Sequence, residues 1–450
     1  MKPKILLVAP YSDKSQKRDY LIPVGLLSIA GVLRQNKYDV VVFNAGFKAK
    51  DKLGYTKKFL LDYKPDIIGL GFPTDAFESA VSIAKLAKES NKNTIIIVGG
   101  IHPTAMPNDT LKVSYFDYLV HGEGELTILE LATAITTGQD IHYLQGISYK
   151  KDDKIITNTP RPEILNLDSL PFDNLDLLID LEKYPKQALG QMHTSRGCIY
   201  NCAYCSSPII WKRNVRFRST NNLLAELEYL YKIHKVRDFN FADDNFTLEP
   251  DRMRAVCNCI LEKGLKIRWR CCSRADIHKR FDSALLKLMK RSGCKNICIG
   301  FESGSQKLLD RADRGIKIDE VGTLVKMVRD AGIKVHADFI IGLPGENGIT
   351  LNQTLALMKH VWKNARATMS VAIFKPYPGT LAYQRNKFPD LKGLGDKFKE
   401  IFNYADACNI KSLSGNLQYL SGRFVESITS PKELSSAFKK TVKAWMRKND

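Results

Sequence analysis

Short strand-like segments alternate with helical segments in two successive series along this chain, and this alternation restricts the fold more than any other feature. In the first series, near-continuous apolar runs such as Ile5–Val8 and Ile67–Gly71 are separated by helical patterns such as Phe77–Ser90. Strands that are apolar throughout are buried on both faces, which indicates a parallel sheet covered by helices. We therefore expect residues 1–145 to form a doubly wound, Rossmann-like α/β domain.

A second series begins near Gln191 and contains six predicted strands, with helical patterns between them. Six βα units of this kind are typical of a partial parallel barrel. We therefore expect a partial (βα)6 barrel over residues 191–385. The predicted strands are Gln191–Ser195, Asp238–Ala242, Ile267–Ser273, Asn296–Gly300, Lys334–Ile340 and Thr368–Phe374.

Two further segments lie outside these domains. Gly146–Lys150 and Lys154–Thr157 flank a short polar turn and predict a β-hairpin. The stretch after the hairpin is rich in Pro, Asn and Asp, so residues 146–190 are predicted to be a hairpin and linker that mark the domain boundary. Residues 386–450 are predicted to form a helical C-terminal region that is basic at its end.

The composition limits the class of protein. The chain has 450 residues, of which 44% are hydrophobic and 26% charged, which excludes a largely disordered chain, a collagen-like chain and a small disulfide scaffold. Lysine and arginine exceed aspartate and glutamate by 68 − 48 = 20, and such a surplus favours anionic partners. No apolar run approaches the roughly 18 residues of a membrane span. The first apolar segment is too short for a signal peptide, so we expect a cytoplasmic protein.

Three closely spaced cysteines, Cys198, Cys202 and Cys205, follow the first predicted barrel strand. Parallel α/β folds bind ligands at the carboxyl ends of their strands, so this loop lies where a site is expected. Thiolates are soft ligands that select iron–sulfur clusters, zinc or copper(I). A structural zinc site closes with four ligands, whereas a cubane cluster held by three cysteines leaves one iron open for a substrate or cofactor.

The pattern Cys198-x3-Cys202-x2-Cys205, with Tyr204 before the third cysteine, resembles the signature of radical S-adenosylmethionine (SAM) enzymes. Further segments at the ends of predicted strands resemble, in the same order, the motifs of the branch that carries an N-terminal cobalamin (B12)-binding domain. These segments are Phe241–Phe246, Cys272–Asp276, Gly300–Ser305, Ile341–Glu346 and Pro376–Thr380.

This resemblance implies that Cys198, Cys202 and Cys205 bind a [4Fe–4S] cluster that cleaves SAM reductively to methionine and a 5′-deoxyadenosyl radical. It also implies which residues bind SAM. Arg274 would bind the SAM carboxylate, because a guanidinium binds a carboxylate with two hydrogen bonds. The predicted SAM contacts are Tyr204, Asp244, Arg274, Glu302, Ser303, Leu343, Gly345 and Phe374.

Several of these residues also have a purely structural interpretation. Arg274 and Glu302 could form an ordinary salt bridge, and Asp243–Asp244 could cap the following helix. Gly342–Gly345 could be only a turn, and Tyr204 could pack the cysteine loop without contacting a ligand.

The resemblance assigns the N-terminal domain to cobalamin. Small residues after its third and fourth strands would let the corrin tail approach the backbone. The motif Asp-x-His-x-x-Gly that is typical of such domains is missing, since Tyr11–Leu26 contains no histidine. Two interpretations stay open: cobalamin binds without a histidine on cobalt, or the domain keeps the fold without the cofactor. The predicted cobalamin contacts are Thr74, Gly99 and Gly100.

The motifs together favour a cobalamin-dependent methylation of an unactivated carbon of a small-molecule substrate. The alternative is a radical cyclase, dehydratase or rearrangement enzyme whose B12-type domain lacks cobalamin. The positive charge suggests a third hypothesis, a cluster- or zinc-bearing nucleic-acid-binding protein, but this hypothesis gives the ordered barrel motifs no role. The charge also fits an acidic electron donor, flavodoxin or ferredoxin, which a basic surface would attract.

Overall fold

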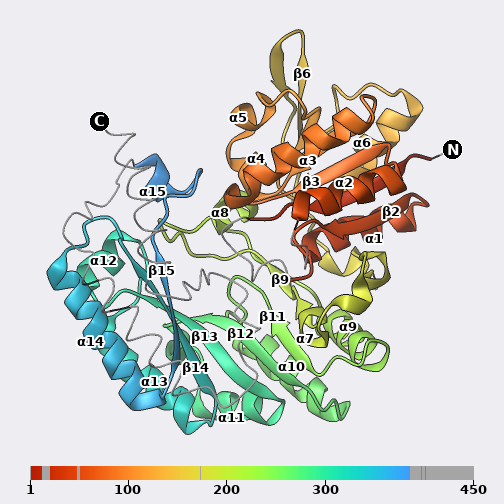
Figure 1. Cartoon of the computed structure of the whole chain (residues 1–450). Helices are drawn as coiled ribbons and strands as arrows, with labels where there is room; N and C mark the ends of the chain where they lie inside the picture. The colour runs from red at the N-terminus through yellow and green to blue at the C-terminus, as the bar shows by residue number, and fades with distance from the viewer. Residues whose placement is uncertain are drawn as a thin grey trace.

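The computed structural model describes residues 2–12, 21–47, 51–172 and 174–385, together with Lys397 and Ile401. It contains an N-terminal α/β unit and a second α/β unit built on a separate sheet (Figure 1). The helical region predicted for residues 386–450 lies almost entirely outside the described residues and stays a prediction. Within the described ranges, no helix is long and apolar enough to cross a membrane.

A seven-stranded sheet forms the centre of the N-terminal unit, in the order β2-β1-β3-β4-β5-β6-β7. The first five strands in this order are parallel, as the doubly wound prediction requires. The predicted hairpin is present and extends the sheet as antiparallel strands. The strands are β1 (Lys4–Ala9), β2 (Asp39–Asn44), β3 (Ile67–Gly71), β4 (Ile95–Gly99), β5 (Tyr118–Val120), β6 (Ile147–Lys151) and β7 (Lys154–Thr157).

Helices cover both faces of this sheet (Figure 1). Helices α1 and α6 pack on one face and α2 and α3 on the other, so two separate hydrophobic clusters form. The sequence pattern does not predict α2, because only Thr56 and Leu60 of this helix are buried. The helices are α1 (Val24–Gln35), α2 (Lys52–Tyr63), α3 (Phe77–Ser90), α4 (Ile101–Ala105), α5 (Pro107–Leu111) and α6 (Glu125–Thr137).

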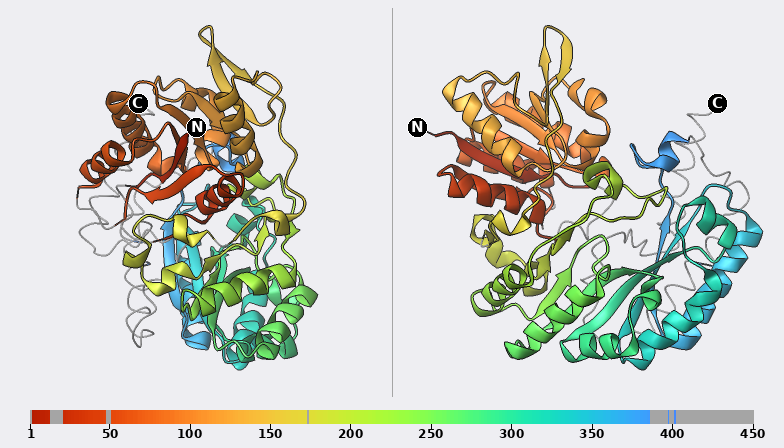
Figure 2. Two further views of the ribbon diagram at one scale, coloured as in Figure 1. Left: turned by 90° about the vertical axis from the view of Figure 1, so that its right-hand side faces the viewer. Right: turned by 180° about the vertical axis from the view of Figure 1, so that it is seen from behind.

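The second unit is a partial barrel whose six parallel strands follow the order β15-β14-β13-β12-β11-β8. Figure 2 shows its helices on the outer side of the curved sheet. The strands are β8 (Gln191–Met192), β11 (Asp238–Phe241), β12 (Arg268–Arg274), β13 (Cys294–Glu302), β14 (Lys334–Ile341) and β15 (Thr368–Ile373). The main helices are α9 (Thr220–Lys232), α10 (Pro250–Glu262), α11 (Ser283–Arg291), α12 (Gln306–Arg311), α13 (Val321–Asp330) and α14 (Gly348–Ala365).

The prediction of one continuous first barrel strand, Gln191–Ser195, is wrong. It divides into β8 and β9 (Ser195–Arg196), and β9 pairs with the antiparallel strand β10 (Arg216–Phe217). The Asp243 carboxylate causes this break, because it accepts hydrogen bonds from the Thr194 amide at 2.6 Å and from the Ser195 hydroxyl at 2.7 Å. Asp243 therefore turns the chain out of the sheet just before the cysteine loop.

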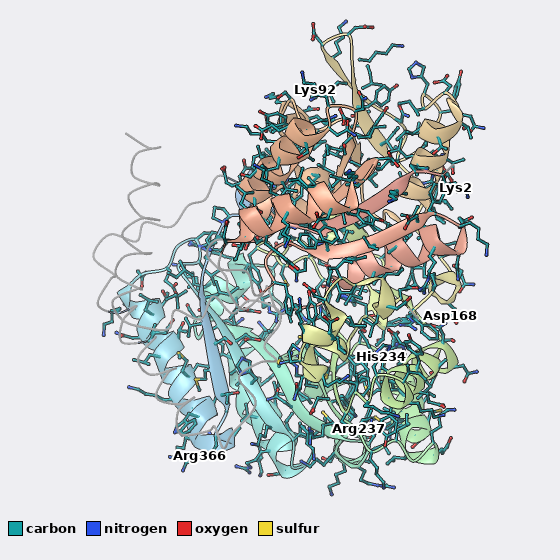
Figure 3. All side chains as sticks on the ribbon, turned by 45° about the vertical axis from the view of Figure 1, so that its right-hand side comes forward. Lys2, Lys92, Asp168, His234, Arg237 and Arg366 are labelled. Carbon is teal, nitrogen blue, oxygen red and sulfur yellow. The ribbon has the colours of Figure 1, made fainter. Side chains whose placement is uncertain are left out.

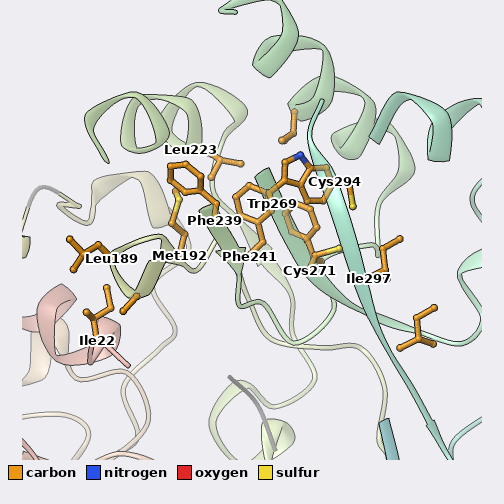
Figure 4. Packing of buried hydrophobic residues seen from close by; sticks show 14 of the residues in the cluster. Ile22, Leu189, Met192, Leu223, Phe239, Phe241, Trp269, Cys271, Cys294 and Ile297 are labelled. Carbon is orange, nitrogen blue, oxygen red and sulfur yellow. The ribbon is translucent and has the colours of Figure 1, made fainter. Parts of the chain in front are cut away.

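The two faces of the barrel strands differ in polarity, because alternate side chains of a strand point to opposite sides. Phe239, Phe241, Trp269 and Ile297 point outward and pack beneath the helices, where they are at most 1% exposed (Figure 4). The inner face is polar, so it is suited to a polar ligand rather than to a packed apolar core. Its side chains include Asn240, Arg270, Cys272, Asn296, Cys298, His336, Asp338 and Ser370.

A group of buried ion pairs, which we call the interdomain clasp, joins the two units. Arg196, in β9, contacts both Glu123, in the turn before α6, and Glu125, the first residue of α6. Arg216 lies 2.7 Å from Glu123, and Ser28 donates a hydrogen bond to Glu125 at 2.8 Å. Sequence analysis did not find this clasp, because its partners lie far apart along the chain.

We expect Glu123→Gln to destabilise the protein by about 3–5 kcal/mol, because the change leaves two buried arginines without a full counter-charge. Chemical denaturation of the variant and the wild type measures this difference. Glu89→Gln is the matched control: it breaks the exposed pair Lys85–Glu89, so its effect should stay within about 1 kcal/mol. Equal effects of the two substitutions would contradict the clasp.

Candidate functional site

The cysteine loop begins directly after β9 and ends at the short helix α8 (Ser207–Trp211). Gly197 starts the loop with a φ of +98°, and a Cβ atom there would lie 1.8 Å from the Asn214 carbonyl oxygen. Only glycine fits such a position without moving the backbone. The Arg-Gly-Cys sequence therefore sets a sharp turn that carries Cys198 away from the interdomain clasp.

Buried polar groups surround the thiols of this loop. Arg274 Nη1 lies 3.3 Å and Arg314 Nη1 3.6 Å from Cys202 Sγ, and the Ser207 amide donates to Cys205 Sγ at 3.4 Å. Burial raises the pKa of Cys205 to about 12. Because metal coordination deprotonates a thiol outright, a bound cluster would need the positive charge that the two arginines supply.

The three thiols can be compared with two kinds of metal site. Among the described residues, no group of three Cys, His, Asp or Glu side chains is placed to hold a single metal ion. A cubane cluster requires a different arrangement, because each cysteine binds its own iron and the sulfur atoms lie farther apart. All three cysteines are free thiols on one short loop, as that arrangement requires.

Glu302, at the end of β13, has an unusual backbone. Its φ is +67°, a region that few residues other than glycine adopt, and the pairing of β13 with β14 is irregular between Gly300 and Glu302. The carboxylate lies 3.2 Å from Arg314 Nη2. Burial raises the pKa of Glu302, an effect that the Arg314 charge opposes. Such strain at a buried charged group is typical of a functional position.

Arg274 and Glu302 do not form the salt bridge that was the structural alternative for these two residues. Arg274 instead lies 3.5 Å from Asp276, and its guanidinium stacks on the Tyr200 ring at 3.4 Å from the ring centroid. Arg274 thus holds the cysteine loop through both Tyr200 and Cys202. Its role with the SAM carboxylate stays a prediction.

Three of the predicted SAM contacts come together in one small apolar cluster. Leu343 and Phe374 are buried in it, and the Tyr204 ring packs against them. Gly345 has a φ of +89°, and a Cβ atom there would lie 1.9 Å from Arg311 Nη1. The cluster packs the turn that carries Leu343 against Tyr204 of the cysteine loop, and its contact with adenine stays a prediction.

Glu346 fixes the turn between Gly342 and Gly345. Its carboxylate accepts a hydrogen bond from the Gly342 amide, and burial raises the pKa of Glu346 to about 7. The turn is therefore held by a buried carboxyl group, and it carries Leu343 into the apolar cluster.

The remaining predicted SAM contacts have protein partners. Asp244 accepts a hydrogen bond from the Ser207 hydroxyl at 2.7 Å, directly beside the cysteine loop. Neither Asp243 nor Asp244 caps the next helix, because α10 begins at Pro250 with Glu249 as its cap. Ser303 is fully buried, and its hydroxyl contacts Thr354 at 3.2 Å. Their contacts with SAM stay predictions.

A cavity of about 450 Å³ lies between the N-terminal unit and the cysteine loop. Glycines at the carboxyl ends of β3 and β4 line it, and it extends to Gly197 and Asp244. Gly25 and Gly122 also line it, and a Cβ atom on either would meet no atom within 4 Å. This open, glycine-lined space fits a cofactor that approaches the backbone closely.

The predicted cobalamin contacts lie differently with respect to this cavity. Gly99 and Gly100 line it, whereas Thr74 is not among its lining residues. The Thr74 hydroxyl lies 3.1 Å from His102 Nδ1, so these two side chains order the loop after β3 and the start of α4. Gly100 has a φ of +93° and contacts the Phe72 backbone, which explains the glycine without a ligand.

The structure therefore places a thiol loop, an apolar cluster and a glycine-lined cavity at the carboxyl ends of the parallel strands of the two units. The sequence matches the Radical SAM superfamily over residues 192–358 and the B12 binding domain over residues 18–132. The first match covers the cysteine loop, and the second covers the glycines at the ends of β3 and β4 that line the cavity.

Known proteins resemble the chain over most of its length. The "uncharacterized methyltransferase PH0819" of Pyrococcus horikoshii is 33% identical and covers 85% of this chain and 82% of its own. The anaerobic magnesium-protoporphyrin IX monomethyl ester cyclase of Rubrivivax gelatinosus is 29% identical over 85% of this chain and 68% of its own. The solved radical SAM methyltransferase TsrM of Kitasatospora setae, with cobalamin and a [4Fe–4S] cluster bound, has a TM-score of 0.71 at 18% identity, covering 85% of this chain and 74% of its own.

The chain belongs to the radical SAM superfamily, in the branch that carries an N-terminal B12 binding domain. It is an enzyme of the family that contains cobalamin-dependent radical SAM methyltransferases and cyclase relatives. The family's cofactors are a [4Fe–4S] cluster, SAM and cobalamin, which confirms the predicted set. This membership gives the ordered barrel motifs a role that the nucleic-acid-binding hypothesis does not.

Proposed function

We propose that this enzyme methylates an unactivated carbon of a small molecule. The observation that carries the proposal is the cavity that runs from the glycine-lined ends of β3 and β4 to Gly197 and Asp244 beside the cysteine loop. A corrinoid in this cavity would lie next to the site of SAM cleavage. The relative from Pyrococcus horikoshii, which is named a methyltransferase, supports the same reaction class.

When bound, the cluster supplies the electron that cleaves SAM, and the corrinoid carries the methyl group. In our proposal Cys198, Cys202 and Cys205 hold the cluster, while Arg274 and Arg314 offset the negative charge of Cys202 in a buried environment. Tyr204, Leu343 and Phe374 would exclude water from the adenosyl group.

We also assign Glu302 to SAM. In our proposal its carboxylate, oriented by Arg314, accepts hydrogen bonds from the polar groups of SAM. The strained backbone at Glu302 is consistent with a group that the fold holds in place for a ligand.

An anaerobic single-turnover experiment with methyl-deuterated SAM tests the methylation proposal without knowledge of the substrate. Reduced holoenzyme should form both 5′-deoxyadenosine and about one S-adenosylhomocysteine per bound corrinoid, because one SAM is cleaved and another gives up its methyl group. Apoprotein reconstituted with the cluster but without cobalamin is the control and should form only 5′-deoxyadenosine. No corrinoid absorbance and no S-adenosylhomocysteine would contradict methylation.

The cyclase relative favours one second candidate, a radical cyclisation without methyl transfer. This candidate uses the same cysteine loop and the same SAM contacts. It transfers no methyl group, so 5′-deoxyadenosine formation without S-adenosylhomocysteine would support it.

We also propose that an acidic flavodoxin or ferredoxin reduces the cluster in the cytoplasm. The support is the net charge of +20, which would attract an acidic donor. Basic residues are spread over both units: Lys2 and Lys92 lie on the N-terminal unit, and Arg237 and Arg366 lie on the barrel (Figure 3). The rate of cluster reduction by flavodoxin should fall as ionic strength rises, and an unchanged rate would contradict the proposal.

A further inference from the structure

The inner face of the barrel buries one arginine that differs from the other buried arginines. Arg216, Arg274 and Arg314 each lie within 4 Å of a carboxylate oxygen. Arg270 is equally buried, at 8% exposure, but makes no ion pair and no hydrogen bond in the part of the chain that the structure describes. Its Nε atom is buried without a partner.

A buried guanidinium without a counter-charge is unfavourable, because burial removes water without replacing its hydrogen bonds. The burial lowers the pKa of Arg270, and the thiols of Cys298 and Cys272 and the carboxylate of Asp338 oppose this shift only through space. An anionic ligand would supply the counter-charge and the hydrogen bonds that Arg270 lacks among the described residues.

The residues on either side of Arg270 in the strand register are neutral hydrogen-bonding groups. In the strand register Arg270 lies directly between Asn240 of β11 and Asn296 of β13. The Asn296 side-chain oxygen is 3.7 Å from the Cys298 thiol, and Asn240 is 9% exposed. Two amide groups thus flank the guanidinium in one row across three strands, and amide N–H groups and a guanidinium are both donors that match an oxyanion.

This row lies inside the barrel, below the SAM contacts. Arg274, which contacts Cys202, is four residues nearer the carboxyl end of the same strand, or roughly 13 Å along it. Asp338 is in register with Arg274 through Gly300, and its side chain is 37% exposed, so the inner face is open to solvent at the level of Arg274. A molecule that enters at this level would reach Arg270 by extending along the inner face of β12.

We propose that Arg270, flanked by Asn240 and Asn296, binds a carboxylate or phosphoryl group of the substrate. The inference rests on the proposed function, in that the substrate whose carbon reacts beside SAM would extend its anionic end into the barrel. It assigns the substrate to small molecules that carry an oxyanion about one barrel depth away from the reacting carbon. Arg270 is a binding residue and takes no part in the chemistry.

Calorimetric titration of anaerobic holoenzyme tests this site with two probes at constant ionic strength, methylphosphonate for the phosphoryl arm and succinate for the carboxylate arm. We expect Arg270→Gln to weaken binding of at least one probe about tenfold or more, because a charge-assisted hydrogen bond is lost. The arm that is affected identifies the anion. The control is Arg268→Gln, on the same strand, whose arginine already pairs with Asp238; it should change binding less than about twofold. Equal weakening by both substitutions, or none by Arg270→Gln, would overturn the proposal.

Chemical labelling of the wild-type holoenzyme tests the site even if Arg270→Gln does not fold. Phenylglyoxal should modify Arg270, and peptide mass spectrometry should show that the bound probe suppresses this modification. Failure of both probes to protect Arg270, or protection by SAM alone, would overturn the assignment to the substrate. These readouts do not depend on S-adenosylhomocysteine formation, so the anion site and the methylation proposal can fail separately.

Discussion

The interdomain clasp sets the position of the cysteine loop relative to the glycine-lined cavity, and the whole site depends on that position. Arg196 precedes the cysteine loop by one residue and is paired with Glu123 and Glu125 at the start of α6. The same turn lines the glycine-rich cavity. Because these charges are buried, each needs its partner: losing one carboxylate would leave an arginine buried without a counter-charge. The clasp thereby ties the cofactor cavity of one unit to the thiol loop of the other.

The two faces of the barrel strands carry different kinds of side chain: the outer face is apolar and the inner face is polar. The outer face packs aromatic and aliphatic side chains beneath the helices and supplies the hydrophobic stability. The inner face carries polar and charged groups, and it ends at Arg274 and Glu302 near the cysteine loop. Buried cations therefore occur at two depths: Arg274 and Arg314 beside the thiols, and Arg270 lower in the barrel. In our account the first two serve the cluster and SAM, and the third serves the substrate.

Much of the fold could be predicted from the sequence, because strand and helix periodicity are local. The parallel strands of both units, the hairpin and the cysteine loop all follow from such patterns. The break at Thr194 could not be predicted, because a carboxylate from a distant turn, Asp243, causes it. Arg314 was missed for the same reason: it lies in a loop outside every motif, yet it contacts Glu302 and Cys202. The unpaired state of Arg270 likewise depends on what surrounds it in space.

The central claim is that three thiolates of one loop hold a cubane cluster with an open iron. Iron and sulfide analysis of anaerobically reconstituted protein, together with 5′-deoxyadenosine formation from SAM, measures it most directly. The account predicts that replacing Cys198, Cys202 and Cys205 together by serine removes the cluster and abolishes SAM cleavage, whereas Cys259→Ser, on the outer helix α10, leaves both unchanged. Full iron and sulfide content with continued cleavage in the triple variant would contradict it.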